Sequence, residues 1–178
     1  MTEHNQMQQI RERAKQIRLV IFDVDGVLTD GSLIMGDDGQ EYKTFNAKDG
    51  HGMKMLQVSG VEIGIISARN SRVVSLRMEN LGIKHVYQGQ RDKLKAFADM
   101  KKKLKLEQNQ IAYVGDDLLD LCIMRKVGLA IAVQDASPAV VTQADWQTTV
   151  PGGRGAAREI CELIMQSQNT YDRILAKY

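Results

Sequence analysis

Two short acidic segments carry most of the residues that could do chemistry. Asp23 and Asp25 stand two positions apart, directly after a short apolar run. Asp116, Asp117 and Asp120 directly follow a second apolar run. If both runs are strands of one sheet, these carboxylates converge, and like charges packed closely raise each other's pKa unless a cation neutralises them. Ligands that are all oxygen favour a hard ion, so the segments together predict a Mg²⁺ site.

Each acidic segment alone has a simpler explanation. Asp-Gly pairs are frequent in loops, and aspartate caps helices. Asp117 could cap a helix that begins near Leu118, and Asp120 could be a solvated acid favoured by the dipole of that helix. The presence of both segments at the ends of strand-like runs favours the shared site.

The elements that would position these acids alternate between strand and helix. Near-continuous apolar runs predict strands at 18–22, 61–66, 111–114 and 128–133. Helical spacing of apolar residues predicts helices at 49–59, 70–81 and 91–104, with a polar, exposed helix at 4–17. This alternation predicts an α/β fold with a doubly wound, mostly parallel sheet. Functional residues in such sheets gather at the carboxyl ends of the strands, where the acids stand.

The bulk composition is that of an ordinary globular protein. The chain has 178 residues, 43% hydrophobic and 26% charged, which predicts a single domain over 1–178. A net charge of +2 gives no reason to expect nucleic acid or a membrane as a partner. The N-terminal segment has no apolar core typical of a secretory signal, and no run is long enough to cross a bilayer. Cys122 and Cys161 lack metal-type spacing, and a cytoplasmic location is expected.

One stretch departs from the alternation. Residues 31–46 form two β-like arms around Asp38 and Gly39, a strong hairpin signal. Because this stretch follows the first acidic turn directly, we expect a hairpin flap over the mouth of the site.

The order of the motifs resembles the haloacid dehalogenase superfamily of phosphotransferases. The motifs are DVDGVLTDG at 23–31, Ser67 at the end of the next strand, Lys93 at a later helix start, and GDDLLD at 115–120. Their order is that of the superfamily, and the resemblance covers residues 18–165. It implies a Rossmann-like core and a phosphatase activity.

The resemblance also implies definite roles. Asp23 would be the nucleophile, since a carboxylate is ionised at neutral pH and needs no activating base. Asp25 would protonate the leaving oxygen and then act as the base for water. Mg²⁺ would bind Asp23, Asp116 and the main-chain carbonyl of Asp25.

Four further residues receive supporting roles from the resemblance. Ser67 would donate a hydrogen bond to a phosphoryl oxygen, and Lys93 would neutralise transition-state charge. Asp117 and Asp120 would orient the metal and Lys93. Taken alone, Ser67 could equally be a helix cap and Lys93 a solvated surface charge.

Members of this superfamily usually carry a cap domain, and this chain has no room for one. The segments between Asp25 and Asp49 and between Arg69 and Lys93 are too short to fold as a domain. A capless site would be open to water. Two explanations are possible: the substrate is a macromolecule, or neighbouring subunits supply the lid. Exposed β arms could supply such a lid because they readily pair between chains.

Longer segments narrow the resemblance to one capless branch. FNAKDGHGMKML at 45–56, LGIKHVYQGQRDKL at 81–94, YVGDDLLDLCIM at 113–124 and GGRGAARE at 152–159 resemble the branch that removes phosphate from an eight-carbon sugar acid phosphate on the route to lipopolysaccharide. Its members are homotetramers whose subunits complete each other's sites. The resemblance implies substrate contacts from Asp25, Asn46, Ala47, Lys48, Asp49, Gly50, Lys54, Arg69, Arg77 and Lys93.

The cations in this set suit a sugar carboxylate, which arginine can hold with two parallel hydrogen bonds. A solvated helix face is the alternative for Arg77, and His51 is expected at a helix start or on the rim of the site rather than as a base. The segment 152–178 is expected to form a C-terminal segment and helix. By the resemblance, its glycine-rich start would reach a neighbouring site; the alternative is a loop followed by a helix cap.

Two positions depart from the branch, and several functions stay open. Ala68 stands where the branch usually has glycine, and Lys48 where it often has arginine. A related nine-carbon sugar acid phosphate, another metabolite or a protein phosphoserine are alternative substrates. A receiver domain that accepts phosphate without turnover, or a non-catalytic binding protein with the same fold, are alternatives of another class.

Overall fold

The computed structural model describes residues 3–178 and contains one large sheet. The six strands pair in the order β5-β4-β1-β6-β7-β8, and every pair is parallel. In chain order these strands are β1 (Leu19–Phe22), β4 (Glu62–Ile66), β5 (His85–Tyr87), β6 (Ile111–Gly115), β7 (Leu129–Ala132) and β8 (Trp146–Gln147). The chain therefore starts in the middle of the sheet and winds outward to both edges.

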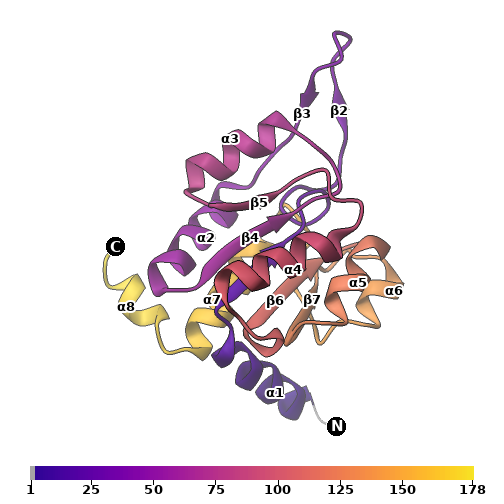
Figure 1. Ribbon diagram of the computed structural model, residues 1–178. Coiled ribbons are helices and arrows are strands. Elements are labelled where there is room, and N and C mark those ends of the chain that lie inside the picture. Colours follow the sequence, from indigo (N-terminus) through magenta and orange to yellow (C-terminus); the bar gives the residue numbers. More distant parts are fainter. Residues whose placement is uncertain (1–2) are drawn as a thin grey trace.

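Helices cover both faces of this sheet, which gives three layers (Figure 1). One face packs against α1 (Glu3–Gln16), α2 (Ala47–Ser59), α3 (Arg72–Leu81), α7 (Ala156–Ser167) and α8 (Tyr171–Leu175). The other packs against α4 (Lys93–Leu104), α5 (Leu121–Met124) and α6 (Pro138–Val141). Two 3-10 turns, η1 (Gln108–Gln110) and η2 (Leu118–Asp120), precede β6 and α5.

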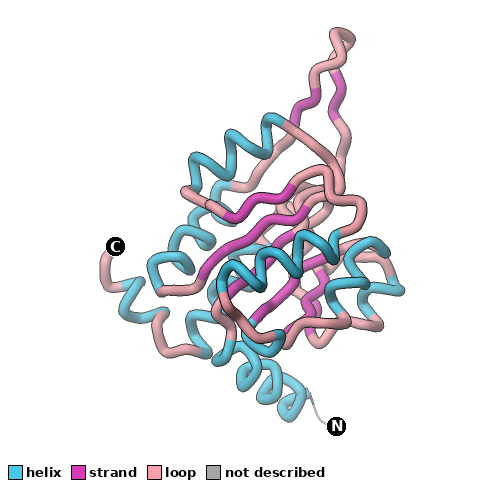
Figure 2. Tube along the Cα trace, in the orientation of Figure 1, coloured by secondary structure: helices cyan, strands magenta, loops and turns pink. Residues whose placement is uncertain are grey.

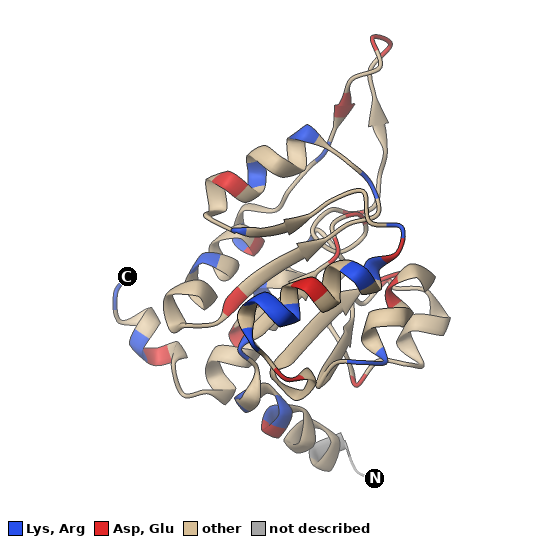
Figure 3. Cartoon of the chain, viewed as in Figure 1, with Lys and Arg blue, Asp and Glu red and all other residues tan. Residues whose placement is uncertain are grey.

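The central strands β1, β6 and β7 are buried along their whole length, and the residues of β1 and β7 are all apolar. In β1, Val20 and Phe22 join the core under α2 and α7, while Leu19 and Ile21 join the core under α4. Figure 3 shows the charged residues mainly on helices and loops, with the strands of the large sheet almost free of them.

The predicted α/β class and its doubly wound parallel sheet are confirmed. The four predicted strands and four predicted helices are present, with ends shifted by at most two residues. Not every apolar residue of the helical patterns faces the core: Val58 and Leu76 are 57% and 54% exposed.

The flap, residues 31–46, is present as a small antiparallel hairpin of β2 (Ile34–Met35) and β3 (Glu41–Tyr42). Its turn contains Gly39 at φ 80, a left-handed conformation that glycine adopts without strain. The hairpin projects well beyond the sheet (Figure 2). Its apolar side chains are exposed: Leu33, Ile34, Met35 and Tyr42 are 45–58% accessible. Among the helices of residues 3–178, none has the length and apolarity needed to cross a bilayer.

Candidate active site

A cleft of about 300 Å³ opens at the carboxyl ends of β1, β4 and β6. The first acidic turn, the turn after β4, the start of α4 and the second acidic segment meet there because parallel strands end at the same edge. Its lining consists of Asp23, Asp25, Gly31, Ser67, Ala68, Arg69, Lys93, Asp116, Asp117, Leu119 and Asp120. The predicted catalytic residues are therefore neighbours in space.

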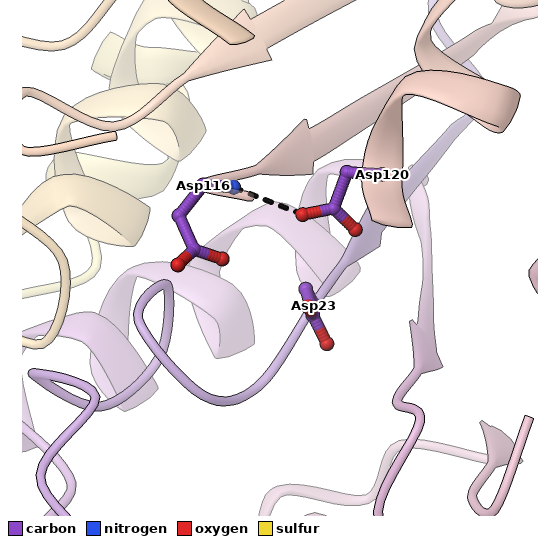
Figure 4. Close-up of side chains that lie close together, drawn as sticks. All are labelled: Asp23, Asp116 and Asp120. Carbon is purple, nitrogen blue, oxygen red and sulfur yellow. Dashed lines mark hydrogen bonds between the residues drawn. The ribbon is translucent and has the colours of Figure 1, made fainter. Parts of the chain in front are cut away.

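Asp23 and Asp116 directly follow β1 and β6, and their side chains lie close together beside Asp120 (Figure 4). Each of these two residues and Asp120 offers a carboxylate oxygen, and the three oxygens lie within 4.8 Å of one another. Burial raises the pKa of Asp116 to about 8, helped by the charges of Asp120, Asp23 and Asp117. Burial and the charge of Asp120 raise the pKa of Asp23 to about 6 although Lys93 opposes the shift.

The oxygens of Asp120 are fully engaged by protein donors. Oδ1 accepts from Lys93 Nζ at 2.7 Å and from Tyr113 OH at 2.6 Å. Oδ2 accepts from the backbone N–H groups of Asp116 and Asp117 at 3.0 and 3.2 Å. With four donors on a side chain that is 0% exposed, Asp120 is suited to orienting its neighbours rather than to holding an ion.

Lys93 is buried, 1% exposed, at the first position of α4. Its ammonium donates to Asp23 Oδ2 and Asp120 Oδ1, both at 2.7 Å, and to Tyr113 OH at 3.3 Å. Burial would lower the pKa of Lys93, but the two carboxylates outweigh it and raise the pKa. A permanently charged ammonium therefore lies beside the candidate nucleophile.

The acidic cluster fits a divalent cation. Asp116 Oδ1 is buried and accepts no hydrogen bond within residues 3–178, an arrangement that is costly unless another ligand of that oxygen binds there. With Asp120 committed to its four donors, the carboxylates of Asp23 and Asp116 are the groups left to bind an ion, and their all-oxygen chemistry suits Mg²⁺. Asp23 Oδ1 also accepts from Val24 N at 2.7 Å.

Gly26 lets the first acidic turn approach Asp116 closely. A Cβ at this position would lie 2.1 Å from Asp116 Oδ2, and its φ of 86 is left-handed. Ser67, buried at the end of β4, accepts a hydrogen bond from Arg69 N at 3.3 Å through its hydroxyl oxygen. Ala68 stands where the branch usually has glycine. Its φ is not positive, so the backbone tolerates the Cβ of alanine there.

Asp117 caps the η2 turn: its carboxylate accepts from Leu118 N at 2.8 Å. The capping interpretation of Asp117 from the sequence is therefore confirmed. Tyr113 was not singled out from the sequence because a tyrosine within an apolar run is indistinguishable from a core residue. Burial, and then the charges of Asp120 and Asp23, raise the pKa of Tyr113 well above its usual value, so its hydroxyl remains a donor.

A second ion-pair network joins Asp25 to the flap, and the sequence did not reveal it. Lys43 Nζ contacts Asp25 Oδ1 and lies 3.2 Å from Glu41 Oε1. The Arg69 guanidinium donates to Glu41 Oε1 at 2.8 Å and lies 3.9 Å from Asp25 Oδ2. The available signal was the alternation in EYK at 41–43, which places Glu41 and Lys43 on the same face of the strand.

Seven of the residues expected to bind substrate do not line this cleft. Asn46 accepts from Lys48 N at 2.8 Å and caps α2, whereas Lys54 is exposed further along the same helix. The Arg77 guanidinium lies 5.9 Å from the centroid of the Phe45 ring. The seven are Asn46, Ala47, Lys48, Asp49, Gly50, Lys54 and Arg77. Their contact with substrate stays a prediction, and His51, exposed on α2, lies against the Tyr178 ring.

Asp49 is 2% exposed and faces the start of α7. Its carboxylate accepts from Gly155 N at 3.1 Å and Arg158 N at 2.8 Å, so it caps that helix from a different element. Burial raises its pKa despite these hydrogen bonds. The glycine-rich turn before α7 packs on the first acidic loop of the same chain, where a Cβ at Gly152 would lie 1.7 Å from Gly26 O. A reach into a neighbouring site stays a prediction.

The fold and this cleft define a hydrolase of the haloacid dehalogenase-like class. A family model described as haloacid dehalogenase-like hydrolase matches residues 85–160. The 3-deoxy-D-manno-octulosonate 8-phosphate phosphatase of Escherichia coli (strain B / BL21-DE3) is 47% identical over 163 residues, 92% of this chain and 87% of the relative.

Solved structures of relatives agree. The phosphatase of that name from Yersinia pestis has a TM-score of 0.91 at 44% identity, covering 92% of this chain and 89% of the other. The one from Moraxella catarrhalis, in complex with magnesium ion, phosphate ion and a KDO molecule, has a TM-score of 0.94 at 43% identity, covering 96% and 98%. The chain belongs to the haloacid dehalogenase-like family of 3-deoxy-D-manno-octulosonate 8-phosphate phosphatases. It is a hydrolase, and the receiver-domain alternative is excluded.

Proposed function

We propose that this chain hydrolyses 3-deoxy-D-manno-octulosonate 8-phosphate to the free sugar acid and phosphate. The observation that carries the proposal is the cleft in which Asp23, Asp25, Ser67, Lys93 and Asp116 meet, together with close relatives that carry this activity in their names. Lipopolysaccharide precursor synthesis in the cytoplasm is the proposed setting.

In the proposed reaction Asp23 attacks phosphorus and the ester oxygen leaves with a proton from Asp25. Water then attacks the aspartyl-phosphate while Asp25 takes its proton, which regenerates the Asp23 carboxylate and the protonated form of Asp25. Lys93, 2.7 Å from Asp23, supports the charge on the phosphoryl group, and Ser67 donates to one of its oxygens. Mg²⁺ held by Asp23, Asp116 and the Asp25 carbonyl would offset the repulsion between nucleophile and anionic ester.

The test is phosphate release from a panel of eight-carbon and nine-carbon sugar acid phosphates, other sugar phosphates and phosphopeptides, with and without Mg²⁺. The highest kcat/KM is expected for the eight-carbon substrate with Mg²⁺. Preference for the nine-carbon acid or for a phosphopeptide would overturn the substrate assignment but not the phosphatase class. The absence of steady phosphate release from every substrate of the panel would overturn the proposed activity.

Asp23→Asn is expected to lower turnover at least about a thousandfold, because the amide is a poor nucleophile. Its circular dichroism spectrum should match that of the parent. Asp172→Asn on α8, an exposed acid outside the cleft, is the matched control and should retain activity. Near-parental turnover by Asp23→Asn would refute the nucleophile assignment.

A further inference from the structure

Lys43 is a buried cation at the mouth of the cleft, and neither the family motifs nor the proposed reaction gives it a role. Its side chain is 1% exposed, although it belongs to a hairpin that is otherwise largely open to solvent. An ammonium withdrawn from water needs anionic partners close by. Lys43 has two, Asp25 and Glu41.

The hairpin geometry places Lys43 there. Ile34 pairs with Tyr42 and Met35 with Glu41, so Lys43 follows directly after the paired part of β3. Side chains alternate along an extended strand, so Glu41 and Lys43 face Asp25 and Arg69 while Tyr42, 52% exposed, faces away. Lys43 therefore connects the base of the flap to the catalytic loop.

Among the contacts of the Asp25 carboxylate, the one with Lys43 restricts it most. Within residues 3–178, Asp25 Oδ1 accepts a hydrogen bond from Lys43, and Oδ2 accepts none. Arg69 Nε is 3.9 Å from Oδ2, but the Arg69 side chain is 46% exposed, so water weakens this ion pair. A buried ammonium restricts the carboxylate more strongly than a solvated guanidinium.

We propose that Lys43 is a positioning residue that fixes the Asp25 carboxylate by one oxygen and leaves the other free for proton transfer. The proposal rests on the proposed function, since it assigns Asp25 the proton-transfer role. The free oxygen gives its proton to the leaving alkoxide as the P–O ester bond breaks and the bond from Asp23 to phosphorus forms. It takes a proton from water as the water oxygen bonds to phosphorus and the Asp23–phosphorus link breaks.

Two substrates separate positioning from general damage. A sugar phosphate has an alkoxide leaving group that needs the proton from Asp25. p-Nitrophenyl phosphate has a leaving group that departs without a proton. Transfer of its phosphoryl group to Asp23 therefore does not need Asp25, whereas hydrolysis of the aspartyl-phosphate does. A misplaced Asp25 therefore slows both steps with the sugar phosphate but only the second step with the aryl phosphate.

Lys43→Met keeps the length of the buried stem and removes the charge. Its kcat on the sugar acid phosphate is expected to fall by about ten- to a hundredfold, within the range of general acid–base catalysis, with KM changed less than about threefold. In rapid mixing with p-nitrophenyl phosphate, the ratio of the nitrophenol burst rate to the steady-state rate should rise at least about tenfold over the parent. Lys43→Arg, which keeps a cation, should restore part of kcat.

Lys126→Met, the same substitution at an exposed lysine that does not line the cleft, is the matched control and should behave like the parent in both assays. If Lys43→Met is poorly folded by circular dichroism, Lys43→Gln takes its place. Equal slowing of burst and steady state, a rise in KM alone, or parental kinetics would each overturn the proposal. If the parent does not hydrolyse the sugar acid phosphate, the proposed function fails, while the burst assay with the aryl phosphate still decides the role of Lys43.

Discussion

At the scale of single residues, the cleft contains two ion-pair networks with different partners. Asp23 and Asp120 share the buried ammonium of Lys93, whereas Asp25 is paired with Lys43 from the flap. The candidate nucleophile and the candidate acid–base group, two positions apart in the chain, thus each have their own cation. Asp116 has no cation within the described residues at ion-pair distance, and burial, with the charges of Asp120, Asp23 and Asp117, raises its pKa.

The raised pKa of Asp116 predicts that this residue destabilises the metal-free protein as pH rises. With a folded pKa of about 8 and an ordinary value of 3.8, the folded chain holds a proton between about pH 4 and 8 that the unfolded chain has lost. Stability therefore falls across this window as pH rises, by an amount on the order of a few kcal/mol. Asp116→Asn, which never ionises, should melt well above the parent near pH 8 without metal, and the difference should shrink steadily as the pH falls toward 5.

The measurement is the melting temperature of both proteins in chelator and in Mg²⁺ from pH 5 to 8.5. Because the charges of Asp23 and Asp116 interact, the difference between the two proteins measures the titration of Asp116 together with its effect on Asp23. Mg²⁺ should stabilise the parent, more so at higher pH because protons compete for the same oxygens, and should stabilise the variant little. Parallel pH curves in chelator would contradict the raised pKa of Asp116.

At the scale of elements, the sequence predicts the helices and strands that a local pattern of apolar residues defines. Short, β-rich apolar runs such as LVIF at 19–22 favour strands buried on both faces, so the sheet and the acids at its end were predictable. The short edge strands β5 and β8 were not predicted, because three and two residues carry too little pattern. Nor was the direction of Asp49 or Lys43, since each has a partner distant in the chain, at Arg158 and Asp25.

Asp49 on α2 caps the start of α7, so its replacement should lower the stability of the protein. Asp49→Ala leaves the buried N–H groups of Gly155 and Arg158 without an acceptor, so the free energy of unfolding should fall by about 1–3 kcal/mol. Urea unfolding measures this change. Asn46→Ala, which removes the more exposed cap of α2, is the comparison and should cost less, about 1 kcal/mol. If both variants lost the same free energy of unfolding, the buried position of Asp49 would contribute nothing to stability beyond an ordinary helix cap.

The glycine-rich turn should transmit the loss of this cap to the cleft. Gly153 N donates to Val27 O at 2.9 Å, and Gly152 lies directly on Gly26, which in turn touches Asp116. A loosened α7 start would therefore free the loop that carries the candidate metal ligands. The apparent affinity for Mg²⁺ of Asp49→Ala should fall more than that of Asn46→Ala, as measured by titration of the melting temperature.

At the scale of the whole molecule, the single chain presents an unfinished binding surface. The cleft lacks a cap domain, the flap exposes Leu33, Ile34, Met35 and Tyr42, and the expected substrate contacts on α2 and α3 lie outside the cleft of their own chain. Exposed apolar β arms tend to pair with another chain. We therefore expect a homotetramer in which the flaps associate and neighbouring subunits complete the sugar-binding part of each site.

Replacing Ile34 and Met35 together by serine should separate the subunits, because it removes apolar area from the flap and leaves the core untouched. Sedimentation velocity should show a tetramer for the parent and smaller species for the double variant. Activity on the sugar acid phosphate should fall at least about tenfold through KM, since its sugar contacts come from neighbours, whereas p-nitrophenyl phosphate, which has no sugar to bind, should be affected much less. Leu175→Ser, which removes a similarly exposed apolar side chain from α8, is the matched control. A parent that sediments as a fully active monomer would refute the tetramer and require the sugar to be bound within one chain.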